Sequence, residues 1–160
     1  MTQLKPDERT IPEPMIEALW ELWAKMGRQP RMRMVTGSMQ PLIKEGDELH
    51  IEPQPKVIHL GEVLIYRHRG QFIAHRLVDI RQSGEKEQFI LKGDAILNLD
   101  PPLPRERIIG RVICVEGASG CANYNSMRWR IFNLLIARFS KSDKLYRTVK
   151  RYARRVIKRI

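Results

Sequence analysis

The pattern of hydrophobic and polar positions changes twice along the chain. Apolar residues follow Ile16 at three, four, seven and ten positions, up to Met26, which is the spacing of an α-helix. Gly27 then ends the pattern. We therefore expect an amphipathic helix over 14–26, after a polar, proline-containing arm over 1–14. A helix packed on the rest of the domain fits this spacing better than a membrane-surface anchor, which its two tryptophans would also suit.

The middle of the chain has a different pattern. Short β-branched or aromatic runs alternate with Gly, Pro and acidic turns, which is typical of strands. The predicted strands cover 32–36, 48–52, 62–66, 72–81, 87–91 and 108–116. Because no helical period interrupts them, we predict a mostly β fold, a small antiparallel coiled sheet or barrel.

The last part returns to the helical period. Small and polar residues fill 117–126, which predicts a linker, and Lys and Arg then occupy one face of an amphipathic pattern. The resulting division is an arm and helix over 1–30, a β domain over 31–116, the linker over 117–126, and a basic helical tail over 127–160.

The net charge of +11 is confined to this tail. Residues 128–160 contain 12 Lys and Arg but one acid, Asp143, whereas the preceding residues are neutral in sum. A neutral body with a basic tail differs from a uniformly basic nucleic-acid binder, so nucleic acid is not the expected partner. An anionic membrane surface is the partner that we expect for the tail.

The remaining composition indicates a cytoplasmic protein, peripheral at the membrane. No apolar run approaches the ~20 residues that span a bilayer, and Met1 to Glu13 lack the features of a signal peptide. A reducing compartment makes a disulfide between Cys114 and Cys121 unexpected. The histidines do not pair at zinc spacing, so we expect neither a metal nor another cofactor.

One segment offers a nucleophile. Ser38 follows Gly37 at the end of a predicted strand and precedes the loop at Pro41, where a turn could expose its hydroxyl. Alone, this signal is weak because Gly-Ser turns are common. His75 lies in an alternating strand, where a single histidine most often has a structural role.

The order of the following segments strengthens this hypothesis. They are Thr36-Gly37-Ser38-Met39-Gln40-Pro41, Gly46-Asp47, Gly61-Glu62-Val63-Leu64-Ile65-Tyr66, His75-Arg76-Leu77, Lys92-Gly93-Asp94 and Ile109-Gly110-Arg111-Val112. In this order they resemble the boxes of the signal peptidase I family of serine endopeptidases. The box that begins with His75 resembles that of the endoplasmic-reticulum and archaeal branch, because bacterial members have a lysine at this position.

The resemblance implies a role for each candidate residue. Ser38 would be the nucleophile and His75 its general base, which suits a neutral imidazole. Asp94 or Asp100 would orient the histidine; each acid could instead serve a local turn or loop, and we favour Asp100. The Ser38 backbone N–H and the Thr36 hydroxyl would form the oxyanion hole.

The leading hypothesis is thus a serine endopeptidase that cleaves a leader, signal or propeptide. The chain departs from the family because no transmembrane helix precedes the serine box and because Ala95 replaces the usual asparagine. A repressor-type autoprotease ranks low, since the sequence has no DNA-binding module and no Ala-Gly or Cys-Gly cleavage site. The alternative is a non-catalytic β domain that binds an anionic membrane or another acidic partner through its tail. Because the boxes end by Val112, we expect deletion of 128–160 to spare cleavage.

Overall fold

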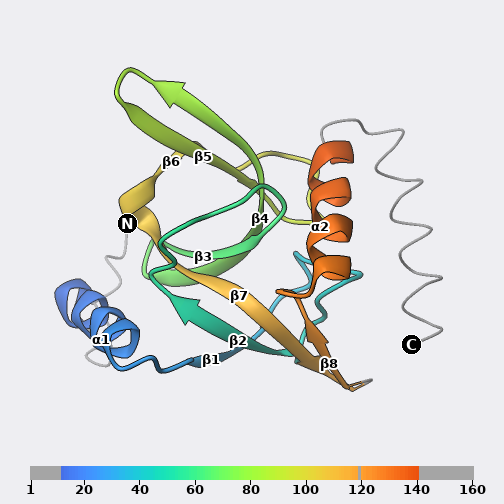
Figure 1. The fold of residues 1–160 in the computed structure, drawn as a ribbon, viewed down its shortest axis with the longest axis horizontal. Helices are drawn as coiled ribbons and strands as arrows, with labels where there is room; N and C mark the ends of the chain where they lie inside the picture. Colours follow the sequence, from blue (N-terminus) through green and yellow to red (C-terminus); the bar gives the residue numbers. More distant parts are fainter. Residues whose placement is uncertain (1–11, 119, 141–160) are drawn as a thin grey trace, which may run out of the picture.

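The computed structural model describes residues 12–118 and 120–140, which form an antiparallel β-sheet flanked by two helices (Figure 1). The predicted arm up to residue 11 and the tail from residue 141 onward lie outside the described residues. The strands are β1 (Arg31–Arg33), β2 (Glu48–Pro53), β3 (Val63–His68), β4 (Gln71–Ser83), β5 (Lys86–Lys92), β6 (Leu103–Pro104), β7 (Ile108–Gly117) and β8 (Gly120–Asn123). The helices are α1 (Glu13–Lys25), the 3-10 turn η1 (Arg105–Arg107) and α2 (Met127–Phe139).

The sheet confirms the mostly β prediction. Its strand order is β1-β2-β7-β3-β4-β5-β6, every pairing is antiparallel, and β8 pairs with β7. The two ends of this order do not pair with each other, so the sheet is coiled but open rather than a closed barrel. All six predicted strands are present, although the first is shorter than predicted and β6 was not anticipated.

Helix α1 packs on the sheet, as predicted. Trp20 is 3% exposed and belongs to the main hydrophobic cluster, with Ile16 and Trp23 against it. Its ring lies over β7 at Gly110, where a Cβ would be 3.1 Å from the tryptophan ring. Ile16, Trp20 and Trp23 of the predicted apolar stripe thus pack on the sheet, whereas Leu19 and Met26 are exposed.

The predicted linker contains a strand, and the expectation of unpaired cysteines was wrong. β8 forms a hairpin with β7 in which Glu116 is opposite Cys121 and Cys114 is opposite Asn123. This register brings Cys114 and Cys121 to a Cα separation of 6.4 Å, within the usual range for a disulfide, and the two are disulfide-bonded. Four of the small residues that suggested a linker, Gly120–Asn123, are thus a paired strand.

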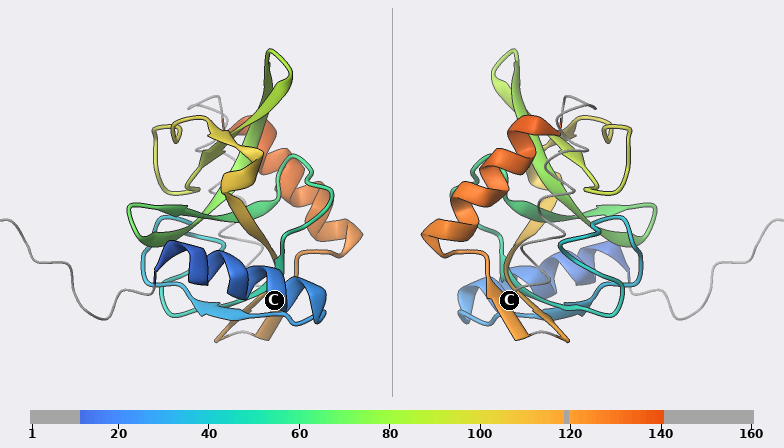
Figure 2. Two further views of the ribbon diagram at one scale, coloured as in Figure 1. Left: turned by 90° about the vertical axis from the view of Figure 1, so that its left-hand side faces the viewer. Right: turned by 90° about the vertical axis from the view of Figure 1, so that its right-hand side faces the viewer.

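Helix α2 is packed on the body rather than extended from it as a tail. Ile136 and Ala137 are buried, and Ala137 joins Val78 of β4 and Ile90 of β5 in one cluster. Figure 2 views the molecule from two opposite sides, with α1 in front in one view and α2 in front in the other. The two helices thus lie on opposite sides of the molecule. Within the described residues, no helix is long and apolar enough to cross a membrane.

Candidate active site

The serine lies in a turn that the core anchors. Met39 and Ile43 are fully buried, and the turn is closed by hydrogen bonds from the Gln40 N–H to the Gly37 carbonyl and from the Ile43 N–H to the Met39 carbonyl. Ser38, directly before Met39, is partly exposed. The apolar residue after the serine therefore fixes the turn, while the hydroxyl stays at the surface.

The predicted oxyanion residue lies beside the serine. The Thr36 hydroxyl donates to Ser38 Oγ over 3.2 Å. Both side chains are accessible to solvent. The structure therefore brings these two hydroxyls together at the surface.

His75 is bound to Asp100. Its Nδ1 lies 2.6 Å from Asp100 Oδ2, and the histidine is 5% exposed. Because a carboxylate accepts, Nδ1 carries the proton, and Nε2 of the neutral ring can then accept one. The Asp100 backbone N–H donates to the Leu91 carbonyl, which ties the acid to the end of β5.

Gly93 is the point where the serine turn and the histidine strand meet. A Cβ at this position would lie 2.9 Å from the Ser38 carbonyl oxygen and 3.0 Å from His75 Nε2. Two residues after Gly93, the backbone N–H of Ala95 donates to the same Ser38 carbonyl over 2.7 Å. Nε2 and the backbone of Ser38 therefore face the same small space. No hydrogen bond joins the two side chains in the described part of the chain, and such bonds often form only when substrate is bound.

Asp94, the other predicted acid, has a different partner. Both of its carboxylate oxygens accept from Arg76, Nε to Oδ1 over 2.8 Å and Nη2 to Oδ2 over 2.6 Å. Arg76 is completely buried and Asp94 is 4% exposed. A buried bidentate pair of this kind is strong only as long as both charges are present. Of the two acids, the structure places Asp100 and not Asp94 against His75.

The same arginine links the site to α2. Its Nη1 donates to the Gly61 carbonyl and to Asn133 Oδ1, each over 2.8 Å. Gly61 touches the helix backbone so closely that a Cβ would be 2.7 Å from Asn133 C. Lys92 Nζ also donates to the Ser140 carbonyl at the end of α2 over 2.9 Å. Deletion from residue 128 would remove the bonds to Asn133 and Ser140, so the expectation that it spares cleavage holds only if the body stays folded without them.

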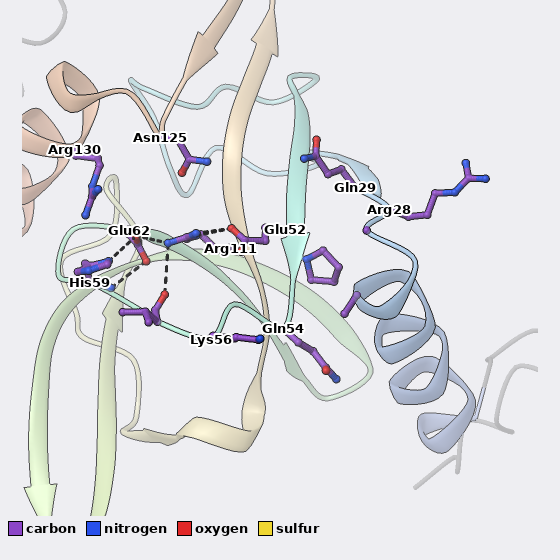
Figure 3. A pocket seen from close by; sticks show the side chains of 14 residues that line it. Arg28, Gln29, Glu52, Gln54, Lys56, His59, Glu62, Arg111, Asn125 and Arg130 are labelled. Atoms are coloured by element: carbon purple, nitrogen blue, oxygen red, sulfur yellow. Dashed lines mark hydrogen bonds and ion pairs between the residues drawn. The ribbon is translucent and has the colours of Figure 1, made fainter.

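A pocket of about 730 Å³ lies elsewhere, and its lining includes neither the serine nor the His75–Asp100 pair (Figure 3). Arg111 lines this pocket. It binds Glu52 through Nε and Nη2, and Glu62 through Nη1. Although burial lowers the pKa of Arg111, these two carboxylates outweigh it and raise the pKa. The arginine of the last box therefore joins β7 to β2 and to the start of β3.

Sequence reasoning missed two polar partners. The first is Tyr66, which donates to the Asp100 carboxylate. In the sequence it was only the last residue of a box, and no role was predicted for it. Asn133 is buried in α2 together with Ile136 and Ala137, and an amide within the apolar run 131–137 is a signal that could have been noticed. His50 bonds to Glu116, with Glu48 nearby, but Arg31 already pairs with Glu48, so this cluster is a surface ion-pair network.

The fold and this site together describe a mostly β protein in which a serine-bearing turn meets a histidine–aspartate pair. No protein-family model matches the chain. A stretch of 67 residues is 33% identical to the signal peptidase complex catalytic subunit SEC11 of Yarrowia lipolytica. That match covers 41% of this chain and 39% of the relative. Over this stretch the chain is a distant homologue of that catalytic subunit, and it spans well under half of the relative's length.

Proposed function

We propose that the protein is a serine endopeptidase of the signal-peptidase type. Ser38 Oγ attacks the carbonyl carbon of a peptide bond while His75 Nε2 takes its proton. The same proton then passes to the leaving amine nitrogen, and water hydrolyses the acyl-enzyme in a second, equivalent step. The observation that carries the proposal is the 2.6 Å contact between His75 Nδ1 and Asp100 Oδ2, which leaves Nε2 facing the serine turn.

The negatively charged oxygen of the tetrahedral intermediate must be stabilised by hydrogen-bond donors. The Ser38 N–H and the Thr36 hydroxyl are our candidates, because the hydroxyl already lies 3.2 Å from Ser38 Oγ. A hydroxyl at this distance can rotate from the serine to a developing oxyanion. Removing one such donor typically lowers kcat by roughly 10²–10³-fold.

The substrate class follows from the resemblance. Signal peptidases prefer small residues before the cut, and we propose an extended leader, signal or propeptide with such residues as the substrate. A strand-like peptide can lie along a sheet edge, where main-chain hydrogen bonds supply the affinity.

Comparative mapping of protein N-termini tests the activity directly. Cells that contain Ser38→Ala in place of the wild type should accumulate uncleaved precursors, and the same precursors should be cleaved by the purified wild-type protein. Thr36→Val is the matched variant, since it keeps the shape of the side chain but removes the donor, and it should slow cleavage without abolishing it. Identical N-termini in wild-type and Ser38→Ala cells, together with inert purified protein, would rule out the peptidase.

A second candidate function is binding to an anionic membrane surface. The observation that favours it is the outer face of α2, where Met127, Ile131, Leu134 and Leu135 are 70%, 54%, 43% and 46% exposed. The same helix has three arginines and no acid. An apolar stripe between cations suits an interface with anionic lipid. A non-catalytic β domain with the same helix would bind in the same way, and the Ser38→Ala experiment separates the two.

A further inference from the structure

Tyr66 and His75 share one acceptor. The Tyr66 hydroxyl donates to Asp100 Oδ2 over 3.0 Å, and this is the oxygen that His75 Nδ1 binds over 2.6 Å. The tyrosine is 4% exposed, and its ring is edge-on to the imidazole with centroids 6.2 Å apart. Two donors from different strands thus converge on a single carboxylate oxygen.

The sheet register explains this convergence. On paired strands β3 and β4, Leu64 is directly opposite His75 and Tyr66 is opposite Ile73. Side chains two residues apart on a strand share a face, as do directly opposite residues, so Tyr66 is the diagonal neighbour of His75. Asp100 reaches this pair from the loop after β5. The arrangement is therefore built by regular strand pairing and not by a flexible side chain.

The tyrosine is held in its donor form. Burial is the main cause that raises the pKa of the Tyr66 hydroxyl above its ordinary value, and the negative charge of Asp100 raises it further. A group that already titrates near ~10 in water thus keeps its proton throughout the neutral range. Tyr66 consequently donates to Asp100 at any pH where a histidine base would work.

We propose that Tyr66 is a positioning residue that sets how strongly Asp100 holds His75. Its hydroxyl fixes the carboxylate and takes up part of the negative charge on Oδ2. Asp100 can then hold the imidazole in the required tautomer without binding the imidazolium so tightly that the proton stays on the ring. This inference rests on the proposed peptidase function and adds a residue to it.

The proposal has a definite sign. Without the tyrosine hydroxyl, the full charge of Asp100 acts on His75 and favours the protonated ring, so a higher pH is needed to obtain the neutral base. Two titratable groups lie at the His75 ring: Asp100 binds its Nδ1, and the Tyr66 ring is edge-on to it. A merely structural tyrosine would lower stability without moving this titration.

Kinetics of full-length Tyr66→Phe test the inference. We expect kcat to fall roughly tenfold with KM little changed, since one hydrogen bond to a charged group is lost. The acidic limb of the kcat–pH profile should move to higher pH. Tyr124→Phe is the matched control, because Tyr124 is also 4% exposed but stacks on Trp129. An unchanged limb in folded Tyr66→Phe protein, or an equal shift in Tyr124→Phe, overturns the proposal.

Two further measurements separate this inference from the function on which it rests. NMR titration of the His75 ring in the Ser38→Ala background requires no turnover, and Tyr66→Phe should raise its midpoint there. In an Asp100→Asn background the same substitution should have little further effect, because its acceptor charge is gone. If the His75 midpoint moves but Ser38 proves dispensable for cleavage, the peptidase proposal fails while the Tyr66 coupling stands. If the midpoint is unchanged, the coupling fails whatever the activity.

Discussion

His75 and Arg76 are consecutive residues of β4, yet their side chains bind two different acids. His75 contacts Asp100, which is 16% exposed in its side chain, whereas Arg76 pairs with Asp94 in the interior. Successive side chains of a strand point to opposite faces, so His75 lies on the face of the candidate site and Arg76 on the face with the buried ion pair. The two acids that sequence reasoning left open are therefore distinguished by the alternation of one strand.

This difference predicts contrasting effects of two Asn substitutions. Asp100→Asn should lower kcat by roughly 10²–10⁴-fold with little change in stability, because the histidine tautomer is no longer held. Asp94→Asn should instead cost on the order of 3–5 kcal/mol of stability, because it leaves the buried Arg76 charge without its counterion. Urea unfolding and steady-state kinetics on both variants measure the two effects. The assignment is wrong if Asp94→Asn loses turnover at unchanged stability while Asp100→Asn stays active.

A second prediction concerns the nucleophile and the base. Ser38→Ala and His75→Ala should each abolish peptide cleavage while the thermal unfolding midpoint stays close to that of the wild type. Since the two groups act on one proton, the double variant should be little worse than either single variant. Multiplicative losses in the double variant would show that the two residues act independently.

Gly93→Ala gives a third prediction, which rests on space alone. The added methyl group would lie 2.9 Å from the Ser38 carbonyl and 3.0 Å from His75 Nε2, so either the turn or the ring must move. We expect kcat to fall by at least roughly tenfold, since small misplacements of reacting groups are costly. Gly110→Ala is the contrast, because its methyl would meet Ile51 at 2.5 Å in the core. Gly110→Ala should lose stability but keep the kcat of its folded fraction. If Gly93→Ala instead keeps its kcat, the space at Gly93 does not matter for catalysis.

Much of the fold could be predicted from the pattern of residues, because period-two and helical spacings are local properties. Helix α1 agrees with its predicted bounds to within one residue at each end, and all six predicted strands are present. β8 was missed because pairing with β7, and not strand propensity, makes Gly120–Asn123 a strand. The disulfide was not expected because the sequence indicated a reducing compartment, and the β7–β8 hairpin that brings its two cysteines together was not predicted either.

The candidate site shows the same limit. Ser38 and His75 could be selected from their boxes, but the choice between Asp94 and Asp100 depends on which face of β4 each acid reaches. Tyr66 depends on the register of β3 against β4, which no local pattern contains. Asn133 reaches the Arg76–Asp94 pair over a sequence distance of 57 residues to Arg76. Long-range contacts of this kind come from tertiary packing, and one sequence does not contain them in readable form.

A fourth prediction concerns alkaline pH. Burial raises the pKa of Tyr66 and also that of Tyr124, so the native state keeps both protons above the pH at which the unfolded chain loses them. Folding is therefore fully favoured below the ordinary tyrosine value of ~10 and is weakened as pH rises beyond it. The free energy of unfolding should fall steadily from about pH 10 upward. Tyr124→Phe should make this decline shallower, and an identical decline in that variant would contradict the prediction.

The last prediction uses two truncations to separate the helix from the segment that follows it. Deletion of 128–160 removes Asn133 from Arg76 and uncovers Val78 and Ile90, so we expect a strongly destabilised protein that tests nothing about membranes. Deletion of 141–160 keeps every residue that the structure describes but removes nine of the twelve basic residues. Each cation near an anionic surface contributes about 1 kcal/mol at low salt, so this shorter deletion should weaken binding to phosphatidylserine-containing vesicles far more than binding to neutral ones. Cleavage of a short peptide should persist, because every residue that we assign to the site precedes position 141.

If vesicle binding survives the shorter deletion, the exposed face of α2 is the anchor, and replacing Ile131 and Leu135 with Gln should then abolish it. If the full-length protein prefers RNA to such vesicles at physiological salt, the membrane proposal is wrong.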